Sequence, residues 1–531
     1  MTARFRVVVA DAIAAEGLEP LRADDRFELI EAPGLTGEPL ARAIEGAHAV
    51  LVRSATRITR ESLAYADKLA VIGRAGVGVD TIDVDAATEQ GIAVLTAPAG
   101  NTISAAELAF ALILSVARRV PAADQSMRAG KWDRKSFTGS ELYGKTLGLV
   151  GAGRIGSEVA RRARAFGMKV MAYDPYLTAE RAGALEIELA PLDAVLRAAD
   201  FVSVHVPLTE ATAGLIGEEQ LARMRSGAIL VNAARGGVVD ESALVQSLRA
   251  GHLRGAALDV YAEEPLPRDH PLRSLSNVVL TPHLGASTEE AQRNVAVEIA
   301  EAVRSALLEG DLSRAVNAPA IGGDDMRRLR PLLDLAVRLG RLGAAMADGA
   351  IRAVELRYAG TSADGLRPLA ASALIGLLQE AVGRGGINLV NALHRAESRG
   401  ITLRQLRLPA EAGYAEYLEL RLQADAARSV GGALIAEGHP RLVRIDEFHV
   451  DVVPRGALVV LRNRDVPGVI GRVGTVLGDA GVNIAEYHQA RLGAGGDALA
   501  AIGVDGELPP SLLEQLRRVP EVKDVRQAQL D

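Results

Sequence analysis

The sequence predicts a multidomain α/β protein that ends in a small ferredoxin-like module. Three observations predict this: Val/Ile-rich runs alternate with helical stretches over the first 290 residues, a glycine-rich turn links one such run to a helix, and residues 457–531 follow the order β-α-β-β-α-β. The 531 residues also exceed the roughly 250 to 300 at which a single core stops growing, so several domains are expected.

The first 98 residues predict a parallel sheet. Val/Ile-rich strand candidates occur at 5–11, 49–54, 69–76 and 92–98, and a helical stretch occurs at 38–47. Neighbouring parallel strands need crossover connections, which are usually helices, and this alternation is typical of such a sheet.

A second α/β series begins near residue 100 and continues to about 290. Its strand candidates are 145–150, 168–174, 201–206, 228–234 and 255–261. A long helix is expected over 287–310, with Ser287 or Thr288 as its N-cap and glutamates in its first turn. We expect this helix to return the chain to the first domain.

The Pro- and Gly-containing stretch 316–323 marks a boundary, and the segment from there to about 455 mixes helix and strand without a recognisable motif. The last residues predict strands at 457–463, 483–492, 498–505 and 522–529, with helices at 469–481 and 511–520. This order predicts the ferredoxin-like module.

Composition favours small-molecule chemistry. The formal net charge of −7 comes without a basic stripe that would collect nucleic acid, and the chain has no cysteine for disulfides, thiolate metal sites or nucleophilic catalysis. No metal site is expected. The start of the chain lacks a signal-peptide pattern, and the most apolar helix candidate, 103–117, is too short for a membrane span. We therefore expect a cytoplasmic protein with no nucleic-acid or membrane partner.

A dinucleotide site is predicted by Gly151-Ala152-Gly153-Arg154-Ile155-Gly156, which matches G-x-G-x-x-G between a strand and a helix. In this motif the first glycine permits a tight turn, the second lets the backbone approach a pyrophosphate, and the third lets the helix pack on the strand. The helix N-terminus supplies N–H groups and positive partial charge, with Arg154 and Ile155 contributing backbone.

Asp174 follows the next strand at about the offset expected for an acid that binds the adenosine ribose. Its carboxylate would accept hydrogen bonds from the ribose hydroxyls, and its negative charge would repel a 2′-phosphate. NAD is therefore the expected cofactor rather than NADP. The alternative is a structural glycine turn in which Asp174 only caps the strand end.

Arg235, Glu264 and His283 each follow a consecutive predicted strand of the second series, so they should meet at one edge of the sheet. Arg235 suits a substrate carboxylate, because its fork can bind one bidentately. His283 suits proton transfer near neutrality, and Glu264 would orient it. Singly, each residue is as easily a surface or structural residue; their common placement favours an active site.

Several stretches together resemble the D-isomer-specific 2-hydroxy acid dehydrogenases, and the resemblance extends over nearly the whole chain. They are GRAGVGVD (73–80), NTISAAELAFALIL (101–114), GKWDRKSFTGSEL (130–142), VGAGRIG, VNAARGGVVDE, LDVYAEEP and PHLGAS. The resemblance implies that Arg235, Glu264 and His283 are catalytic. It also implies NAD contacts at Val206, Ala233, Ala234, Asp259, Gly285 and Ala286, beside those of the glycine motif. Asp259 is expected to face the nicotinamide carboxamide.

The resemblance implies a Rossmann-like NAD-binding domain (99–290) inserted in a flavodoxin-like substrate domain (1–98 plus 291–316). An α+β intervening domain (318–455) and a ferredoxin-like ACT domain (457–531) would follow. Val77 and Val206 depart from the family, which often has polar residues there, so any side-chain hydrogen bond at these positions is lost.

The substrate implied by the resemblance is 3-phospho-D-glycerate, oxidised to 3-phosphohydroxypyruvate as the first step of L-serine biosynthesis. A phosphorylated acid carries about three negative charges near neutrality and calls for several cations. By resemblance Arg53, Arg74, Gly76, Val77 and Asn101 hold it. A weaker candidate, Arg134, would reach in from a neighbouring subunit.

The tail resembles an ACT domain, a module that commonly binds amino acids between paired copies. Asn463 and Asp465, expected on the first strand-to-helix loop, and Asn483, which opens the next strand, match its ligand region. L-serine is the implied effector and a homotetramer the implied assembly. Asp465-Val-Pro-Gly is alternatively just a turn and helix cap.

The sequence leaves other interpretations of its function open. Reduction of 2-oxoglutarate is a plausible side activity. The chain is alternatively a glyoxylate or hydroxypyruvate reductase, or an NADH-sensing corepressor-like scaffold that keeps the triad without turnover.

Overall fold

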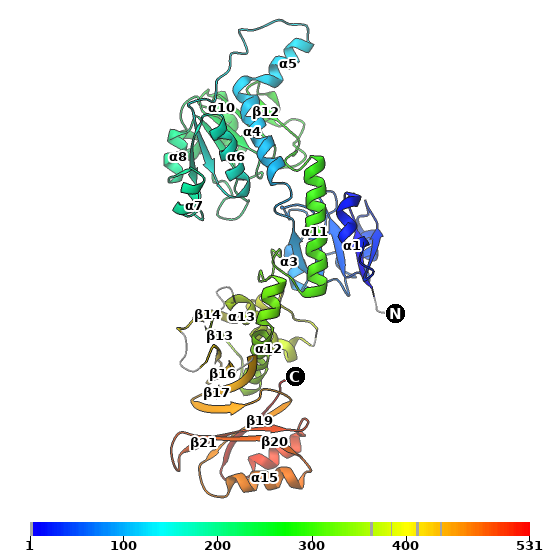
Figure 1. Cartoon of the computed structure of the whole chain (residues 1–531), viewed down its shortest axis with the longest axis vertical. Coiled ribbons are helices and arrows are strands. Elements are labelled where there is room, and N and C mark those ends of the chain that lie inside the picture. The colour runs from blue at the N-terminus through cyan, green and yellow to red at the C-terminus, as the bar shows by residue number, and fades with distance from the viewer. Residues whose placement is uncertain (1–3, 362–364, 384, 410–413, 436–437) are drawn as a thin grey trace.

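The structure is a computed structural model that describes residues 4–361, 365–383, 385–409, 414–435 and 438–531. Its four sheets follow one another along the long axis of the molecule (Figure 1). The second sheet in chain order lies at one end, and the first lies between the second and the third. Within the described residues, no helix combines the length and the apolar character that crossing a membrane requires.

The first sheet has five parallel strands in the order β2-β1-β3-β4-β5, which is the flavodoxin-like order. Its strands are β1 (Phe5–Val9), β2 (Phe27–Glu31), β3 (Ala49–Val52), β4 (Val71–Arg74) and β5 (Ala93–Thr96). Its own helices are η1 (Ala15–Leu18), α1 (Glu19–Arg22), α2 (Gly37–Ile44) and α3 (Val84–Glu89). The central strand β3 is buried at every residue, as a parallel strand covered on both faces should be.

The second sheet has seven parallel strands in the order β12-β11-β10-β9-β6-β7-β8. They are β6 (Thr146–Val150), β7 (Lys169–Tyr173), β8 (Glu188–Leu189), β9 (Phe201–Val204), β10 (Ile229–Asn232), β11 (Gly255–Leu258) and β12 (Val278–Leu280). The helices are α4 (Thr102–Arg118), α5 (Val120–Arg128), α6 (Arg154–Ala165), α7 (Ala179–Ala184), α8 (Leu192–Ala198), α9 (Glu218–Arg223), α10 (Glu241–Arg249) and η2 (Pro271–Ser274). The strand order reverses between β6 and β9, and ligands of open α/β sheets bind at such a point.

Two helices carry the chain between these sheets. The chain leaves the first sheet through α4 and returns through α11 (Glu289–Glu309), which begins at the N-cap Thr288. Buried residues of α11, including Val295 and Ile299, join the core of the first sheet. The predicted return of this helix to the first domain is therefore confirmed.

A third, six-stranded sheet has the order β14-β13-β15-β16-β17-β18. It contains β13 (Ala353–Ala359), β14 (Thr402–Arg407), β15 (Glu416–Gln423), β16 (Ala427–Ile435), β17 (His439–Ile445) and β18 (Phe448–Val452), with helices α12 (Gly323–Met346), α13 (Leu366–Val382) and α14 (Ala392–Glu397). All of its neighbouring strands are antiparallel except β13 and β14.

The last sheet has four antiparallel strands in the order β20-β21-β19-β22, so the predicted ferredoxin-like fold is confirmed. Its elements are β19 (Ala457–Arg464), α15 (Val469–Asp479), β20 (Ile484–Arg491), β21 (Asp497–Val504), α16 (Pro510–Arg517) and β22 (Val522–Gln529). One apolar cluster extends from α12 and β15 into β19 and β21, so the third and fourth units share a core.

Candidate active site

The turn between β6 and α6 contains two glycines that no larger residue could replace. Gly151 has φ +94°, and a Cβ there would lie 2.8 Å from the carbonyl oxygen of His205. At Gly156 a Cβ would collide with the carbonyl oxygen of Gly151. Both positions therefore exclude any larger residue for reasons internal to the fold.

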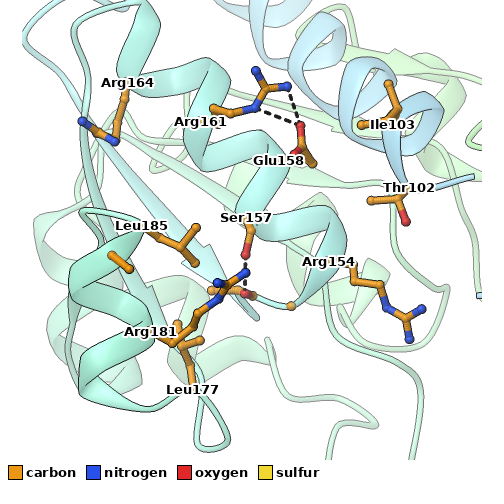
Figure 2. Close-up of a pocket in the computed structure, with 13 residues that line it drawn as sticks. Thr102, Ile103, Arg154, Ser157, Glu158, Arg161, Arg164, Leu177, Arg181 and Leu185 are labelled. Atoms are coloured by element: carbon orange, nitrogen blue, oxygen red, sulfur yellow. Dashed lines mark hydrogen bonds and ion pairs between the residues drawn. The ribbon is translucent and has the colours of Figure 1, made fainter. Parts of the chain in front are cut away.

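Gly153 differs, because a Cβ there would meet no atom within 4 Å. Its backbone faces a cavity of about 570 Å³ that opens at the start of α6 and continues between α6 and α7 (Figure 2). Arg154 and Ser157 line the same cavity. An open glycine at the N-terminus of a twelve-residue helix fits the pyrophosphate of a dinucleotide.

Asp174 directly follows β7 and is tied to this loop. Its carboxylate accepts the backbone N–H of Ala152 at 2.9 Å and that of Tyr176 at 2.9 Å. The acid is thus held beside the glycine turn, where a ribose would lie. Val206 lies on the other side of the turn, with a methyl 2.8 Å from the Cβ position of Gly151.

Arg235 lies in the loop after β10, and this loop is organised by Asn232, which is 2% exposed. Asn232 donates to the carbonyl oxygen of Arg235 at 2.9 Å and accepts the N–H of Ala234 at 3.1 Å. Arg235 Nη1 in turn donates to the carbonyl oxygen of Ala234 at 2.6 Å. These bonds fix Ala233, Ala234 and Arg235 at the carboxyl edge of the sheet.

Glu264 and His283 come together from the loops after β11 and β12. His283 Nδ1 lies 2.7 Å from Glu264 Oε2, and Glu264 Oε1 accepts the N–H of Tyr261 at 3.0 Å. Both side chains remain partly exposed. The carboxylate therefore holds one ring nitrogen of His283 and leaves Nε2 free to exchange a proton with a ligand.

Asp259 is 1% exposed and is hydrogen-bonded to the loop that carries His283. Its carboxylate accepts Thr281 Oγ1 at 2.6 Å and the N–H groups of Leu284 and Gly285 at 2.8 and 3.0 Å. Burial raises the pKa of Asp259, against the lowering effect of these donors. His283 has φ 56°, a conformation unusual outside glycine, and these bonds hold the loop in it. The expected contact of Asp259 with a nicotinamide stays a prediction.

The first sheet contributes two arginines, Arg53 and Arg74, to the same region. The pKa of Arg74 is lowered to about 10, mainly by burial and further by the charges of Arg235 and Arg53. Arg74 Nε is buried without a hydrogen-bond partner in the described part of the chain. The Arg53 backbone is held by Asp11, whose carboxylate accepts its N–H at 2.5 Å. Three mutually repelling guanidinium groups are well suited to a multiply charged anion.

Asn101 and the loop after β4 complete the cleft. Asn101 lies at the N-terminus of α4, and its Oδ1 is buried without a partner among the described residues. Gly76 has φ +145°, and a Cβ there would collide with the Arg74 guanidinium. Val77 beside it is 39% exposed. Arg134 lies on the exposed stretch between α5 and β6, and among the described residues no contact joins it to this group.

The predicted effector residues are placed differently from expectation. Asn463 lies within β19 rather than on the following loop and is 1% exposed, because β19 continues to Arg464 by pairing with β21. Its Oδ1 accepts Gln489 Nε2 at 3.2 Å. The placement on the loop was therefore wrong for Asn463, although Asp465 does follow the strand.

Asn483 lies at the opposite end of this sheet from Asp465. β19 and β20 both pair antiparallel with β21, and Ile484 and Ala457 share the partner Val504. Asn483 is thus level with the start of β19, about 20 Å from its end at ~3.3 Å per residue. One copy of the chain does not bring Asn483 and Asp465 together.

Sequence reasoning missed residues that support the site. Asn232, Thr281 and Tyr261 hold its loops by hydrogen bonds, and the Tyr261 hydroxyl lies within donating distance of the carbonyl oxygens of Leu258 and Thr281, at 3.0 and 2.9 Å. Asp80 meets Arg235 across the cleft. Asn232 was detectable as a lone amide ending an apolar strand; the others carry no signal in the sequence.

Comparison with known families agrees with this geometry. Residues 110–285 match the D-isomer specific 2-hydroxyacid dehydrogenase NAD binding domain, residues 328–446 the D-3-phosphoglycerate dehydrogenase intervening domain, and residues 457–521 the ACT domain.

Relatives match over the whole length. The D-3-phosphoglycerate dehydrogenase of Methanocaldococcus jannaschii is 42% identical over 98% of this chain and 99% of its own. That of Bacillus subtilis is 40% identical with the same coverage of both chains. Among solved structures, a glyoxylate reductase from Paecilomyes thermophila matches with a TM-score of 0.54 and 32% identity, covering 60% of this chain and 99% of that one.

Proposed function

Since this chain belongs to the D-3-phosphoglycerate dehydrogenases, a family of D-isomer-specific 2-hydroxyacid dehydrogenases, we propose that it oxidises 3-phospho-D-glycerate to 3-phosphohydroxypyruvate with NAD. This reaction is the first step of L-serine biosynthesis. The observation that carries the proposal is the convergence of Arg53, Arg74 and Arg235 on a cleft that also holds the His283–Glu264 pair.

In the proposed mechanism His283 acts as the general base. Its Nε2 takes the proton of the substrate hydroxyl, while Glu264 holds Nδ1 and stabilises the imidazolium that forms. Arg235 binds the carboxylate and polarises the neighbouring carbon–oxygen bond. In the reverse direction the same imidazolium returns the proton.

The cofactor would be held at the glycine loop and at the carboxyl edge of the second sheet. The pyrophosphate would lie at Gly151, Gly153, Arg154, Ile155 and Gly156, the ribose on Asp174, and the remainder along Val206, Ala233, Ala234, Asp259, Gly285 and Ala286. NAD, when bound, supplies the acceptor for the hydride that leaves the substrate.

The phosphate would be bound by Arg53 and Arg74, with Asn101 and the backbone of Gly76 and Val77 positioning the carbon chain. The pKa of Arg74 is lowered first by burial and then by the charges of Arg235 and Arg53, which supports this role, because a bound anion would favour the charged form of Arg74 against both effects. Arg134 is proposed to act only from a neighbouring subunit.

A steady-state assay with NAD tests the proposal directly by comparing 3-phosphoglycerate with unphosphorylated glycerate. We expect kcat/KM to be at least 100-fold higher for the phosphorylated acid, since two charge-assisted contacts are each worth about 1.5 to 3 kcal/mol. Equal values for the two acids would instead indicate a glyoxylate or hydroxypyruvate reductase. NADH binding without turnover would indicate a corepressor-like scaffold. The same assay, run with NADH and 2-oxoglutarate, tests whether reduction of 2-oxoglutarate is a side activity.

Regulation and assembly are proposed as follows. The division into residues 1–98 plus 291–316, 99–290, 318–455 and 457–531 gives a substrate, an NAD, an intervening and an ACT domain. L-serine would bind between two ACT domains, with Asp465 of one copy near Asn483 of another. The proposed assembly is a homotetramer. Isothermal titration calorimetry tests whether L-serine binds. The cytoplasmic location stays a prediction.

A further inference from the structure

Asp80 and Arg235 form an ion pair that crosses the cleft between the two sheets. Asp80 belongs to the loop after β4 of the first sheet, and Arg235 to the loop after β10 of the second. Arg235 Nε lies 3.6 Å from Asp80 Oδ2. The arginine that the proposed mechanism assigns to the substrate carboxylate therefore already faces a carboxylate of the protein.

Gly78 provides the space for this pair. A Cβ at position 78 would lie 2.6 Å from Asp80 Oδ2 and would collide with Arg235 Nη2. A side chain there would require one of these two flexible ends to shift. Glycine at position 78 therefore leaves both groups room to approach each other.

Among the described residues, the side chain of Asp80 makes one direct polar contact. Its side chain is 66% exposed, and Arg235 is the one polar partner that the described residues give it. Asp11, the other carboxylate near the arginines, is instead buried and bound to the N–H of Arg53 and the N–H and hydroxyl of Thr56. Asp80 can therefore move away from the arginines without the loss of a buried hydrogen bond, whereas Asp11 cannot.

The charges around Asp80 explain why a carboxylate stands there. Arg53, Arg74 and Arg235 repel one another, whereas Asp80 and Asp11 oppose that repulsion at Arg74. Before an anion binds, Asp80 balances part of the positive charge of the three arginines. A substrate carboxylate that reaches Arg235 supplies the same charge with better geometry, because it can contact the planar fork directly.

We propose that Asp80 is a placeholder counter-ion, which occupies Arg235 while the cleft is empty and competes with the substrate carboxylate for it. The proposal rests on the proposed function, because it assigns the substrate carboxylate to Arg235. Asp80 is a positioning residue that sets anion affinity, and the cross-cleft pair opens when substrate binds. It lets product leave by taking back the arginine.

The test is Asp80→Asn, which keeps the size of the side chain and removes its charge. We expect the KM for 3-phosphoglycerate to fall about 3- to 10-fold, because an exposed like charge close to the substrate is lost. We expect kcat to stay within about twofold. A KM that is unchanged or higher would overturn the proposal, since a merely structural Asp80 would only weaken binding when altered.

A second readout does not depend on turnover. Oxalate, a small dicarboxylate, is titrated into the NADH-bound full-length protein, and binding is followed by NADH fluorescence. Its Kd should fall about 3- to 10-fold in Asp80→Asn and stay near the wild-type value in Asp80→Glu, which keeps the charge. Asp25→Asn is the matched control, because it makes the same charge change at an exposed position.

The two readouts separate the possible failures. An oxalate Kd that does not respond to Asp80→Asn overturns the placeholder role even if 3-phosphoglycerate is turned over. Absence of turnover in the wild type overturns the proposed function, while a tighter oxalate complex in Asp80→Asn still supports the competition for Arg235.

Discussion

His283 Nδ1 lies 2.7 Å from Glu264 Oε2, although the two residues are 19 positions apart and reach each other from loops after different strands. The carboxylate occupies Nδ1, so in the proposed mechanism Nε2 is the ring nitrogen that faces the substrate. Glu264→Gln keeps the shape of the side chain but removes the charge that stabilises the imidazolium. We expect kcat to fall roughly 100-fold with NADH affinity unchanged, measured by steady-state kinetics and fluorescence titration.

Glu263→Gln is the control for that prediction. Glu263 belongs to the same loop and is exposed, and among the described contacts none involves its side chain. It should retain wild-type kcat. Full activity of Glu264→Gln would refute the role of the pair in proton transfer.

We expect Arg74 to lower the stability of the ligand-free protein and to increase its affinity for the substrate. Its pKa is lowered to about 10 by burial and by Arg235 and Arg53, so its charge is present below that pH and is lost as the pH rises through it. The affinity for 3-phosphoglycerate should therefore decline above about pH 10, where an ordinary arginine would remain charged. KM measured from pH 8 to 11 checks this sign.

Arg74→Met should raise the KM for 3-phosphoglycerate at least 10-fold and at the same time raise the melting temperature of the ligand-free protein by about 2 to 4 °C. The reason is that a buried, partly unpaired charge costs free energy of folding. Arg57→Met, at an exposed position of the same domain, should change neither value. A lower melting temperature for Arg74→Met would argue that the arginine is structural.

Alanine substitutions at Gly153 and Gly156, in the turn between β6 and α6, should affect different properties of the protein. Gly156→Ala places a methyl against the Gly151 carbonyl and should lower the melting temperature of the protein. Gly153→Ala meets no protein atom within 4 Å, so it should leave the melting temperature unchanged and weaken NADH binding by 10-fold or more. Gly183→Ala, on α7 with equally open surroundings, is the control. Normal NADH affinity in Gly153→Ala would place the pyrophosphate elsewhere.

Asp259 should make the site sensitive to acid. Burial raises the pKa of Asp259, so on lowering the pH this carboxylate takes up its proton before an ordinary aspartate does. Protonation weakens its hold on the N–H groups of Leu284 and Gly285, and the His283 loop should loosen. In the reduction direction, where His283 must carry its proton and therefore causes no loss in acid, we expect kcat to fall in mild acid in the wild type. In Asp259→Asn, which mimics the protonated form, it should already be low and nearly independent of pH in that range. A wild-type acid limb that persists unchanged in Asp259→Asn would contradict this.

Local pattern was enough to predict much of the architecture. The alternation of Val/Ile-rich runs with helical stretches predicted both parallel sheets, because buried strands need continuous apolar residues and parallel strands need crossovers. The order of elements after residue 457 predicted the ferredoxin-like fold in the same way. Asn463 was placed wrongly because the end of β19 depends on pairing with β21, which is a contact distant in sequence.

The sequence by itself determined the cofactor loop, the parallel sheets and the three strand ends that carry Arg235, Glu264 and His283, because these follow from short-range rules of chain geometry. Only the tertiary structure decided which groups meet across the cleft. The burial of Arg74 among like charges, the support of the His283 loop by Asp259, and the pairing of Asp80 with Arg235 over Gly78 all join segments far apart in the chain. Such contacts depend on how two sheets approach each other, and no spacing along the chain encodes that distance.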